Sequence, residues 1–201
     1  MVNEVKRALV LLAPGFEEVE ALTPVDYLRR ANIDVVTAAV DDKAAGKTVT
    51  GSHNITVLAD TSLSELADQD RLLPSGWDAV VVPGGPGVAG LAASGRACSF
   101  IKAMAEAGKW VCAICAAPAA VLAPLGILAG RKFTCYPGYE EKVTGAIWSE
   151  DRVVISANPG KPGGIITSRA AGTTGEFSAA IISALVSEEE ARQISARVLL
   201  K

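Results

Sequence analysis

Cys115 is the residue of this sequence whose type and surroundings best suit nucleophilic chemistry. The run Ala113-Ile114-Cys115-Ala116-Ala117 puts it directly after an apolar segment that predicts a buried strand, with small residues two positions away on either side. A nucleophile held on a sharp strand-to-helix turn needs such small neighbours. The start of the following helix would favour the thiolate and lower the pKa of the thiol. A buried, unreactive cysteine in an alanine-rich segment is the alternative that the local pattern leaves open.

A glycine-rich stretch from Pro83 to Gly87 follows a second apolar segment at 78–82. Successive glycines let backbone N–H groups converge on an anion, so we expect an oxyanion hole here. The spacing of Gly85, Gly87 and Gly90 also matches a dinucleotide fingerprint, but a proline interrupts it and no ribose-binding acid follows the next strand. The stretch therefore favours an oxyanion site over a nucleotide site.

Three glutamates, Glu17, Glu18 and Glu20, lie at the start of a helix predicted over 16–31. Carboxylates at a helix start usually complement the helix dipole, and we expect Glu17 and Glu18 to do so while facing water. Glu20 has a different role if the helix turns it toward Cys115. Burial would then raise its pKa and let it donate a hydrogen bond or move a proton.

His53 is the one histidine of the chain. It falls in the segment 47–58, where Gly51 between β-branched residues predicts an inserted hairpin. We favour a surface or interface histidine. To act as a base for Cys115, His53 would need the hairpin to fold back, or would have to come from another subunit.

The other cysteines are weaker candidates than Cys115. Cys112 and Cys115 form a C-x-x-C, but residues three apart on a strand point to opposite faces, which disfavours a redox pair. Cys98 on a predicted helix and Cys112 inside a strand are expected to be structural, whereas Cys135 follows a predicted strand and could face the same cleft as Cys115. With one histidine and no second cysteine pair, no metal site is expected.

Two β-α-β patterns and several later strands must position these residues. The first pattern runs through a strand at 5–12, a helix at 16–31 and a strand at 33–40, and the second through 78–82, 96–107 and 110–114. The remaining predicted elements are the hairpin at 47–58, an alanine-rich helix ending near Pro124, strands at 131–135, 152–156 and 165–167, and helices at 176–186 and on to Leu199. This order predicts one α/β domain over residues 1–201, with reactive groups at the carboxyl ends of a mainly parallel sheet.

Composition excludes several classes of protein. The 201 residues carry a formal net charge of −3, with acids and bases interspersed, so neither nucleic acid nor a membrane surface is an expected partner. The uncharged stretch 110–130 is long enough to span a bilayer, but Pro118, Pro124 and Gly126 break it. The N-terminal apolar run is too short for a signal peptide, and we expect a cytoplasmic protein with free thiols.

Five stretches of the sequence resemble the ThiJ/PfpI superfamily, in the branch of the DJ-one and YajL-like proteins. They are 7–20 (RALVLLAPGFEEVE), 24–30 (PVDYLRR), 80–85 (VVVPGG), 113–118 (AICAAP) and 167–173, which includes TSR and GT. The resemblance runs nearly end to end. It implies a flavodoxin-like three-layer α/β/α sandwich with a mainly parallel sheet and an inserted β-hairpin, usually a homodimer and without a cofactor.

The resemblance also implies roles for the residues of the elbow and the glycine loop. Cys115 matches the oxidation-prone nucleophile of the family, and Glu20 matches the protonated glutamate beside it. Gly84, Gly85 and the amide of Ala116 match a backbone pocket for a substrate or sulfinate oxygen.

Four further residues are implied at the rim of the site. Arg30 and Arg169 match basic residues around the site and the dimer interface, and His53 falls where some relatives carry an arginine. Tyr136 is a departure, because catalytically stronger members carry a histidine before the proline. Tyrosine donates a hydrogen bond but is a poor base near neutral pH, so histidine-assisted catalysis is not expected and Tyr136 is expected only to contact substrate.

The activity that the resemblance implies is a cofactor-independent glyoxalase reaction on the reactive dicarbonyls methylglyoxal and glyoxal, with a deglycase-type reaction on glycated thiols and amines. The alternative is an oxidative-stress sensor or redox-regulated chaperone, in which Cys115 is oxidised to a sulfinate held by the same amides and by Glu20.

Overall fold

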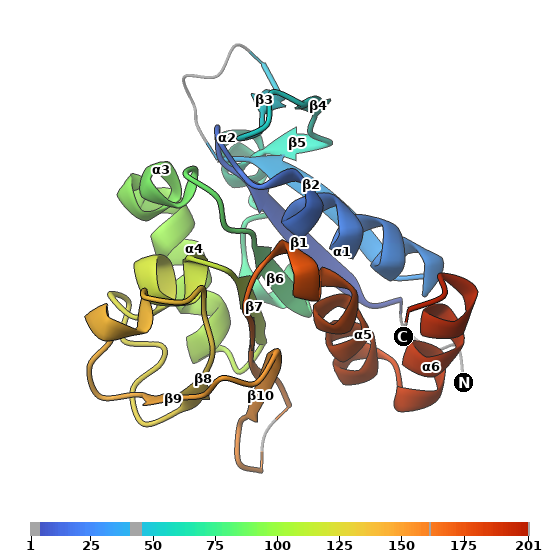
Figure 1. Ribbon diagram of the computed structural model, residues 1–201. Coiled ribbons are helices and arrows are strands. Elements are labelled where there is room, and N and C mark those ends of the chain that lie inside the picture. The colour runs from blue at the N-terminus through green and yellow to red at the C-terminus, as the bar shows by residue number, and fades with distance from the viewer. Residues whose placement is uncertain (1–4, 41–45, 161, 201) are drawn as a thin grey trace.

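A seven-stranded sheet forms the centre of the protein. The computed structural model describes residues 5–40, 46–160 and 162–200. The strand order is β10-β11-β7-β6-β1-β2-β5 (Figure 1), and every described pair of neighbours is parallel except β10 and β11. Its strands are β1 (Arg7–Leu12), β2 (Asp34–Ala39), β5 (Thr61–Ser62), β6 (Ala79–Val82), β7 (Trp110–Ile114), β10 (Val153–Ala157) and β11 (Gly164–Ser168).

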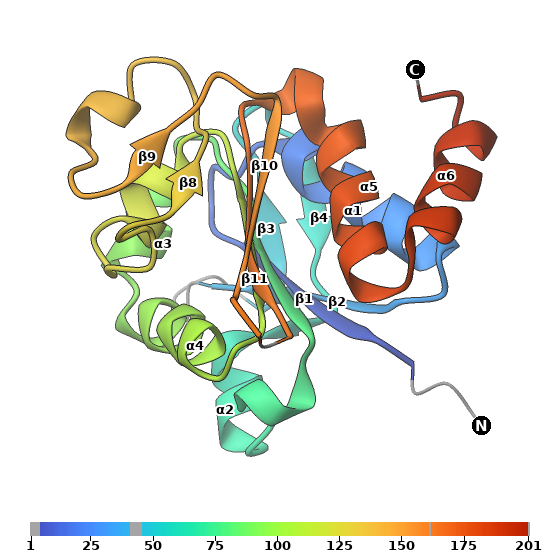
Figure 2. The same ribbon diagram turned by 90° about the horizontal axis from the view of Figure 1, so that it is seen from below.

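Helices cover both faces of this sheet, which makes a three-layer sandwich (Figure 2). One layer contains α1 (Glu18–Arg30), α5 (Thr174–Leu185) and α6 (Glu188–Arg197). The opposite layer contains α3 (Val88–Ala93) and α4 (Gly95–Glu106), and α2 (Leu63–Asp68) follows β5. The expected flavodoxin-like α/β sandwich with a mainly parallel sheet is confirmed.

Alternation along β1 explains why the sheet needs both layers. Leu9 and Leu11 pack in the apolar cluster under α4, whereas Val10 and Leu12 pack in the cluster under α1 and α5. Side chains two residues apart lie on the same face of a strand, so an unbroken apolar run buries both faces. Each of these four side chains is at most 1% exposed.

The predicted hairpin is the antiparallel pair β3 (Thr48–Thr50) and β4 (Thr56–Leu58), which forms a small sheet of its own. Two backbone hydrogen bonds attach it to the loop after β1. Gly15 N–H donates to Thr50 O at 2.8 Å, and Ser52 N–H donates to Phe16 O at 2.8 Å. The hairpin therefore lies over the start of α1.

Two predicted elements differ in the structure. The alanine-rich helix after β7 is only the five-residue π-helical turn η2 (Pro118–Leu122), followed by turns, because Pro124 and the positive φ of Gly126 prevent a longer helix. The strand predicted at 131–135 is reduced to β8 (Lys132–Phe133), which pairs with β9 (Ile147–Trp148) outside the central sheet. No pattern in the sequence had indicated β9, β5, α2 or α3, all of which are short.

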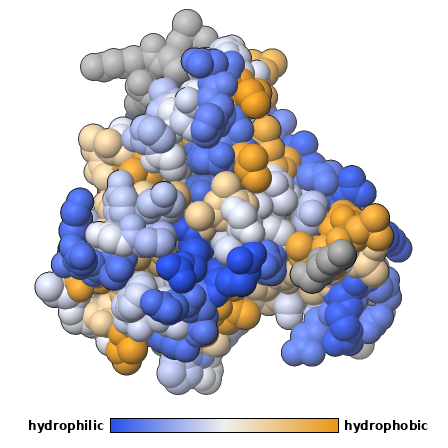
Figure 3. All heavy atoms as spheres, in the orientation of Figure 1, coloured by the Kyte–Doolittle hydropathy of each residue, from blue (hydrophilic) through white to orange (hydrophobic). Residues whose placement is uncertain are grey.

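Three single turns of 3-10 helix complete the described elements. They are η1 (Pro74–Gly76), η3 (Glu140–Lys142) and η4 (Ala171–Thr173). Among the described residues no helix is long and apolar enough to cross a membrane. On the face drawn in Figure 3, hydrophobic residues appear as separate small groups among hydrophilic ones.

Candidate active site

Cys115 follows β7 in a left-handed backbone conformation, with φ of 63°. Non-glycine residues adopt this conformation at a cost of about 1 kcal/mol, so surrounding contacts must hold it. Its N–H donates to Ser168 O at 3.0 Å, and its carbonyl accepts from Tyr136 N–H at 2.8 Å. Ala113 and Ala117 on either side are fully buried, so a larger side chain at either position would have to fit into the packed interior. This is the sharp strand-to-helix turn that the small neighbours predicted.

Glu20 lies in the first turn of α1 and is 1% exposed. Its Oε2 accepts a hydrogen bond of 2.9 Å from Gly84 N–H, and its carboxyl is hydrogen bonded to the Cys115 thiol. Burial raises the pKa of Glu20 to about 7, and the nearby Glu17 carboxylate adds to the rise. Glu20 therefore holds a proton well above the pH at which an exposed glutamate loses it.

The thiol of Cys115 departs from the sequence-based expectation of a lowered pKa. Burial and the Glu20 carboxylate raise its pKa to about 12, while the amides of Gly85 and Ala116 act in the opposite direction. The turn that follows is too short to supply the helix dipole that the expectation assumed. A proton on Glu20 removes the opposing charge, so the Cys115–Glu20 pair ionises as a unit.

The glycine loop after β6 brings the backbone against this pair. A Cβ on Gly84 would lie 2.6 Å from Cys115 Cβ and 2.6 Å from Glu20 Oε2, closer than any side-chain carbon tolerates. Gly85 has φ of 82°, and a Cβ there would lie 2.6 Å from Glu17 N. The structure thus brings Cys115 together with Glu20, Gly84, Gly85 and Ala116, the residues that the resemblance groups, while their roles stay predictions.

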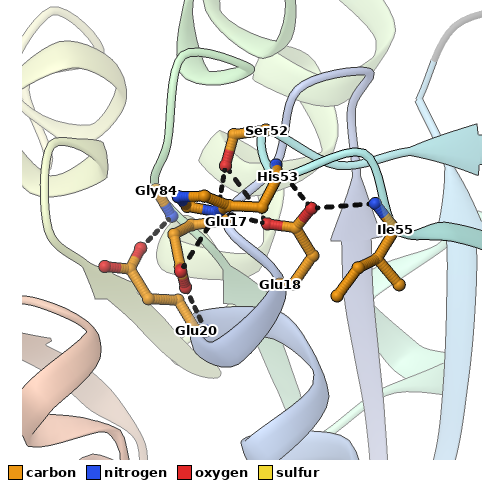
Figure 4. Close-up of polar contacts among 7 residues, drawn as sticks. All are labelled: Glu17, Glu18, Glu20, Ser52, His53, Ile55 and Gly84. Atoms are coloured by element: carbon orange, nitrogen blue, oxygen red, sulfur yellow. Dashed lines mark hydrogen bonds and ion pairs between the residues drawn. The ribbon is translucent and has the colours of Figure 1, made fainter.

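The expectation that Glu18 faces water is wrong, because the residue is buried, with 3% of its surface exposed. Its Oε1 accepts from His53 N–H at 2.7 Å and from Ile55 N–H at 3.4 Å (Figure 4). Its Oε2 lies 2.9 Å from His53 Nδ1 and accepts from Ser52 Oγ at 3.2 Å. Burial opposes ionisation of Glu18, but these hydrogen bonds outweigh it and hold the pKa at about 2.

Glu17 connects the two carboxyls. It is the N-cap of α1, and its Oε2 accepts a hydrogen bond of 2.7 Å from Glu20 N–H. Its other oxygen lies 3.9 Å from His53 Nδ1. In the described residues Glu17, Glu18 and His53 are a trio whose donor atoms lie within 4.8 Å of one another, yet both carboxylates already accept amide hydrogen bonds. The arrangement is therefore accounted for by these hydrogen bonds, and the absence of a metal site stays a prediction.

His53 lies on the turn of the hairpin and does not act on Cys115 directly within this chain. Its side chain is 69% exposed and contacts Ser52, Glu17 and Glu18. The pKa of His53 is raised, first by the hydrogen bond to Glu18 and then by the charges of both glutamates. A surface histidine was the favoured prediction, but the ordered contact with a buried carboxylate was not foreseen.

The basic residues of the predicted rim have other partners in the described chain. Arg30, the last residue of α1, donates to the Asp26 carboxylate one turn earlier at 2.8 Å, on an exposed side of the helix. Arg169 donates to Glu150 O at 2.9 Å, and its charge acts on Cys135. Neither has a described hydrogen bond to Cys115 or Glu20.

Tyr136 and the remaining cysteines occupy distinct surroundings. Tyr136 is 45% exposed and packs edge-on against Tyr139, next to the backbone of Cys115. Cys112 is fully buried in β7, and burial raises the pKa of Cys135 to about 12. Cys98 lies on α4 and donates to backbone carbonyls of the preceding turns.

Gly51 is the one residue in the sequence that could have signalled the role of Glu18. A Cβ on Gly51 would collide with the Glu18 carboxylate, so the glycine at the hairpin turn leaves the space that this side chain fills. Ser168, within the TSR motif, was also not singled out, although its carbonyl accepts the Cys115 N–H.

Comparison with known proteins identifies the family. A model of the DJ-1/PfpI family matches residues 6–184. The chain belongs to the DJ-1/PfpI family. Among curated members, it is 34% identical to dj-1beta of Drosophila melanogaster over 97% of both chains. It is 34% identical to DJ-1 homolog B of Arabidopsis thaliana over its whole length, but spans only 43% of that protein. A protein of Pyrococcus horikoshii named a deglycase is 32% identical, over 76% of this chain and 86% of its own.

Solved structures of the DJ-1/PfpI family have the same fold. The crystal structure of Drosophila melanogaster DJ-1beta aligns with a TM-score of 0.85 at 34% identity, over 98% of this chain and 100% of the other. Toxoplasma gondii DJ-1, described as oxidized, aligns with a TM-score of 0.86 at 32% identity, over 97% and 98%.

Proposed function

We propose that this member of the DJ-1/PfpI family is a glyoxalase or deglycase-type enzyme that acts on methylglyoxal, glyoxal or their adducts. The observation that carries the proposal is the contact between a raised-pKa carboxyl and a thiol on a strained turn, beside convergent amides. The Pyrococcus relative named a deglycase supports it.

The steps of the reaction are derived from the positions of the thiol, the carboxyl and the amides. The Cys115 thiolate adds to the aldehyde carbon and forms a carbon–sulfur bond, while the amides of Gly85 and Ala116 stabilise the oxygen and the protonated Glu20 gives that oxygen a proton. The resulting Glu20 carboxylate removes the hydrogen of the former aldehyde carbon and returns it to the neighbouring carbon, while the hydroxyl proton on the former aldehyde carbon moves to the oxygen of that neighbouring carbon. This leaves a thioester, which water hydrolyses to lactate, or to glycolate from glyoxal, restoring the thiol. No external oxidant or reductant is required.

Substitution of the sulfur tests the proposal. Cys115→Ser should reduce methylglyoxal consumption to background, while Cys98→Ser on α4 should retain it. Lactate or glycolate formation, followed by chromatography, measures the reaction. Equal turnover by wild type and Cys115→Ser would overturn the proposal.

A redox-sensor or chaperone function is the second candidate, favoured by the amides that face the sulfur and by the oxidized Toxoplasma relative. Oxidation to a sulfinate would put its oxygens against the Gly85 and Ala116 amides and the Glu20 carboxyl. Intact mass after mild peroxide distinguishes the two. A gain of two oxygens confined to Cys115, together with negligible dicarbonyl turnover, favours the sensor.

We propose that the protein functions as a homodimer. We also propose that it is located in the cytoplasm. Val19 on α1 and Ile55 and Leu58 on the hairpin are about half or more exposed at 48%, 52% and 74%, on elements that lie side by side. An interface would bury these apolar side chains. The four cysteines are all unpaired, as a reducing compartment requires. Mass measurement in solution by light scattering tests the dimer.

A further inference from the structure

A continuous polar path connects the hairpin surface with the interior of the site. Nδ1 of the exposed His53 ring lies 2.9 Å from Glu18 Oε2 and 3.9 Å from Glu17 Oε1. Oε2 of Glu17 in turn accepts the 2.7 Å hydrogen bond from Glu20 N–H (Figure 4). The sequence singled out His53, but the proposed mechanism does not use it.

We propose that His53 is a positioning residue for the Cys115–Glu20 pair: its positive charge, held against Glu17 and Glu18, offsets their negative charges and so controls the reactivity of the Cys115 sulfur. The proposal deepens the proposed function, on which its catalytic consequence rests, but its effect on the sulfur is measurable without any substrate.

Charge balance at the start of α1 is the physical reason. Glu17 and Glu18 bring two negative charges beside Glu20, and the Glu17 charge opposes ionisation of Glu20. A protonated His53 reduces this opposition, because its ring lies within 4 Å of an oxygen of each. When His53 loses its proton, the negative field on Glu20 increases and the pair ionises at higher pH.

Apart from Glu17, the groups that contact Glu20 are neutral, so His53 is the residue that offsets the charges of Glu17 and Glu18. Glu20 faces Gly84 N–H from the loop after β6, the backbone of Ala171 from η4, and the Cys115 thiol from the end of β7. His53 faces Ser52 from its own hairpin and the two glutamates from α1. Among these described groups His53 supplies the one positive charge, and its hydrogen bond to Glu18 favours the charged form by raising its pKa.

The hydrogen bonds fix where the charge lies. Glu18 is buried and accepts from the His53 amide as well as lying against its ring, so backbone and side chain are both held. The hairpin is also bonded to the loop after β1. An exposed side chain is usually mobile, but the His53 ring has two hydrogen-bonding partners, Glu18 Oε2 at 2.9 Å and Ser52 Oγ at 3.1 Å.

The test measures alkylation of Cys115 by iodoacetamide between pH 5 and 9, in a Cys98→Ser background, followed by peptide mass analysis. His53→Gln removes the charge but keeps a hydrogen-bonding side chain. We expect its rate at pH 7 to be about threefold lower at low salt, equivalent to an upward shift of about half a pH unit. The difference should shrink in about 1 M salt, because the ring is exposed to screening.

Two controls separate charge from structure. His53→Lys retains a positive charge and should keep the wild-type rate at pH 7, whereas a purely structural role would make Lys and Gln equally slow. Arg192→Gln, on the distant α6, removes one exposed positive charge and should leave the profile unchanged. An unaltered profile in His53→Gln, or a salt-independent loss in both His53 variants, would overturn the proposal. Absence of dicarbonyl turnover in every variant would instead count against the proposed function alone.

Discussion

Glu18 and Glu20 lie two residues apart at the start of α1 and are both buried, yet they ionise in opposite ways. The hydrogen bonds around Glu18 hold its pKa at about 2, whereas burial raises the pKa of Glu20 to about 7. Glu18 is surrounded by donors from the hairpin, while Glu20 shares its surroundings with a thiol and receives few backbone N–H groups. Burial alone does not decide the charge of a carboxyl; the number and kind of its donors do.

The largest contrast between the two carboxyls is expected in turnover. Glu20→Gln removes the group that moves the proton, so methylglyoxal consumption should fall on the order of 100-fold or more. Glu18→Gln leaves the reacting atoms in place and should stay within about threefold of wild type. Steady-state kinetics of the two variants check this. Equal losses would mean that Glu20 has no role beyond that of its neighbour.

The space around Glu20 can be closed by one methyl group. Gly84→Ala would put a Cβ against Cys115 Cβ and Glu20 Oε2, and should cost about 3 kcal/mol in unfolding free energy and abolish turnover. Gly90→Ala is the matched control, since its added methyl meets nothing within 4 Å. Urea unfolding of both variants measures the difference. A stable, active Gly84→Ala protein would contradict the described site.

Stability near neutral pH should depend on Glu20. Its pKa is about 7 in the folded protein and 4.5 in an exposed glutamate, so the stabilisation is fully present below pH 4.5 and is lost as pH rises through 7. The loss between pH 5 and pH 7 should be about 2 kcal/mol. Glu20→Gln should lack it. Unfolding free energies of wild type and Glu20→Gln, measured between pH 5 and pH 7, test this prediction. If the free energy of the variant falls with pH as steeply as that of wild type, the pKa of Glu20 is not raised.

Stability in acid should depend on Glu18 with the opposite sign. Its folded pKa of about 2 lies below the 4.5 of an exposed glutamate, so its stabilisation is present above pH 4.5 and is lost as pH falls toward 2. Glu18→Gln should cost about 1.5 kcal/mol at pH 7 and less at pH 3. Thermal unfolding at the two pH values tests this, and an identical cost at both would show that ionisation of Glu18 is not involved.

Most of the fold could be predicted because its signals are local. The apolar runs that become β1, β6 and β7 are continuous, and the helical spacing of α1 and α4 is regular, so buried parallel strands under helices follow from pattern alone. The failures are short elements such as β8, β9 and η2. Two to five residues are too few to show a strand or helix periodicity in the sequence. The conformation of such a short segment depends on its contacts with the rest of the chain.

The local pattern around Cys115 indicated a turn between small residues at the end of a buried strand, because small side chains permit such a turn. The pattern of strands also put Glu20 and the glycine loop at the same edge of the sheet, since parallel strands bring their carboxyl ends together. The three-dimensional contacts were needed to show that Glu18 is buried under the hairpin against His53, that Glu20 contacts the sulfur, and that the thiol pKa is raised. The ionisation of a buried group depends on hydrogen-bond donors that distant segments of the chain contribute. A short stretch of sequence therefore does not show whether the group is charged.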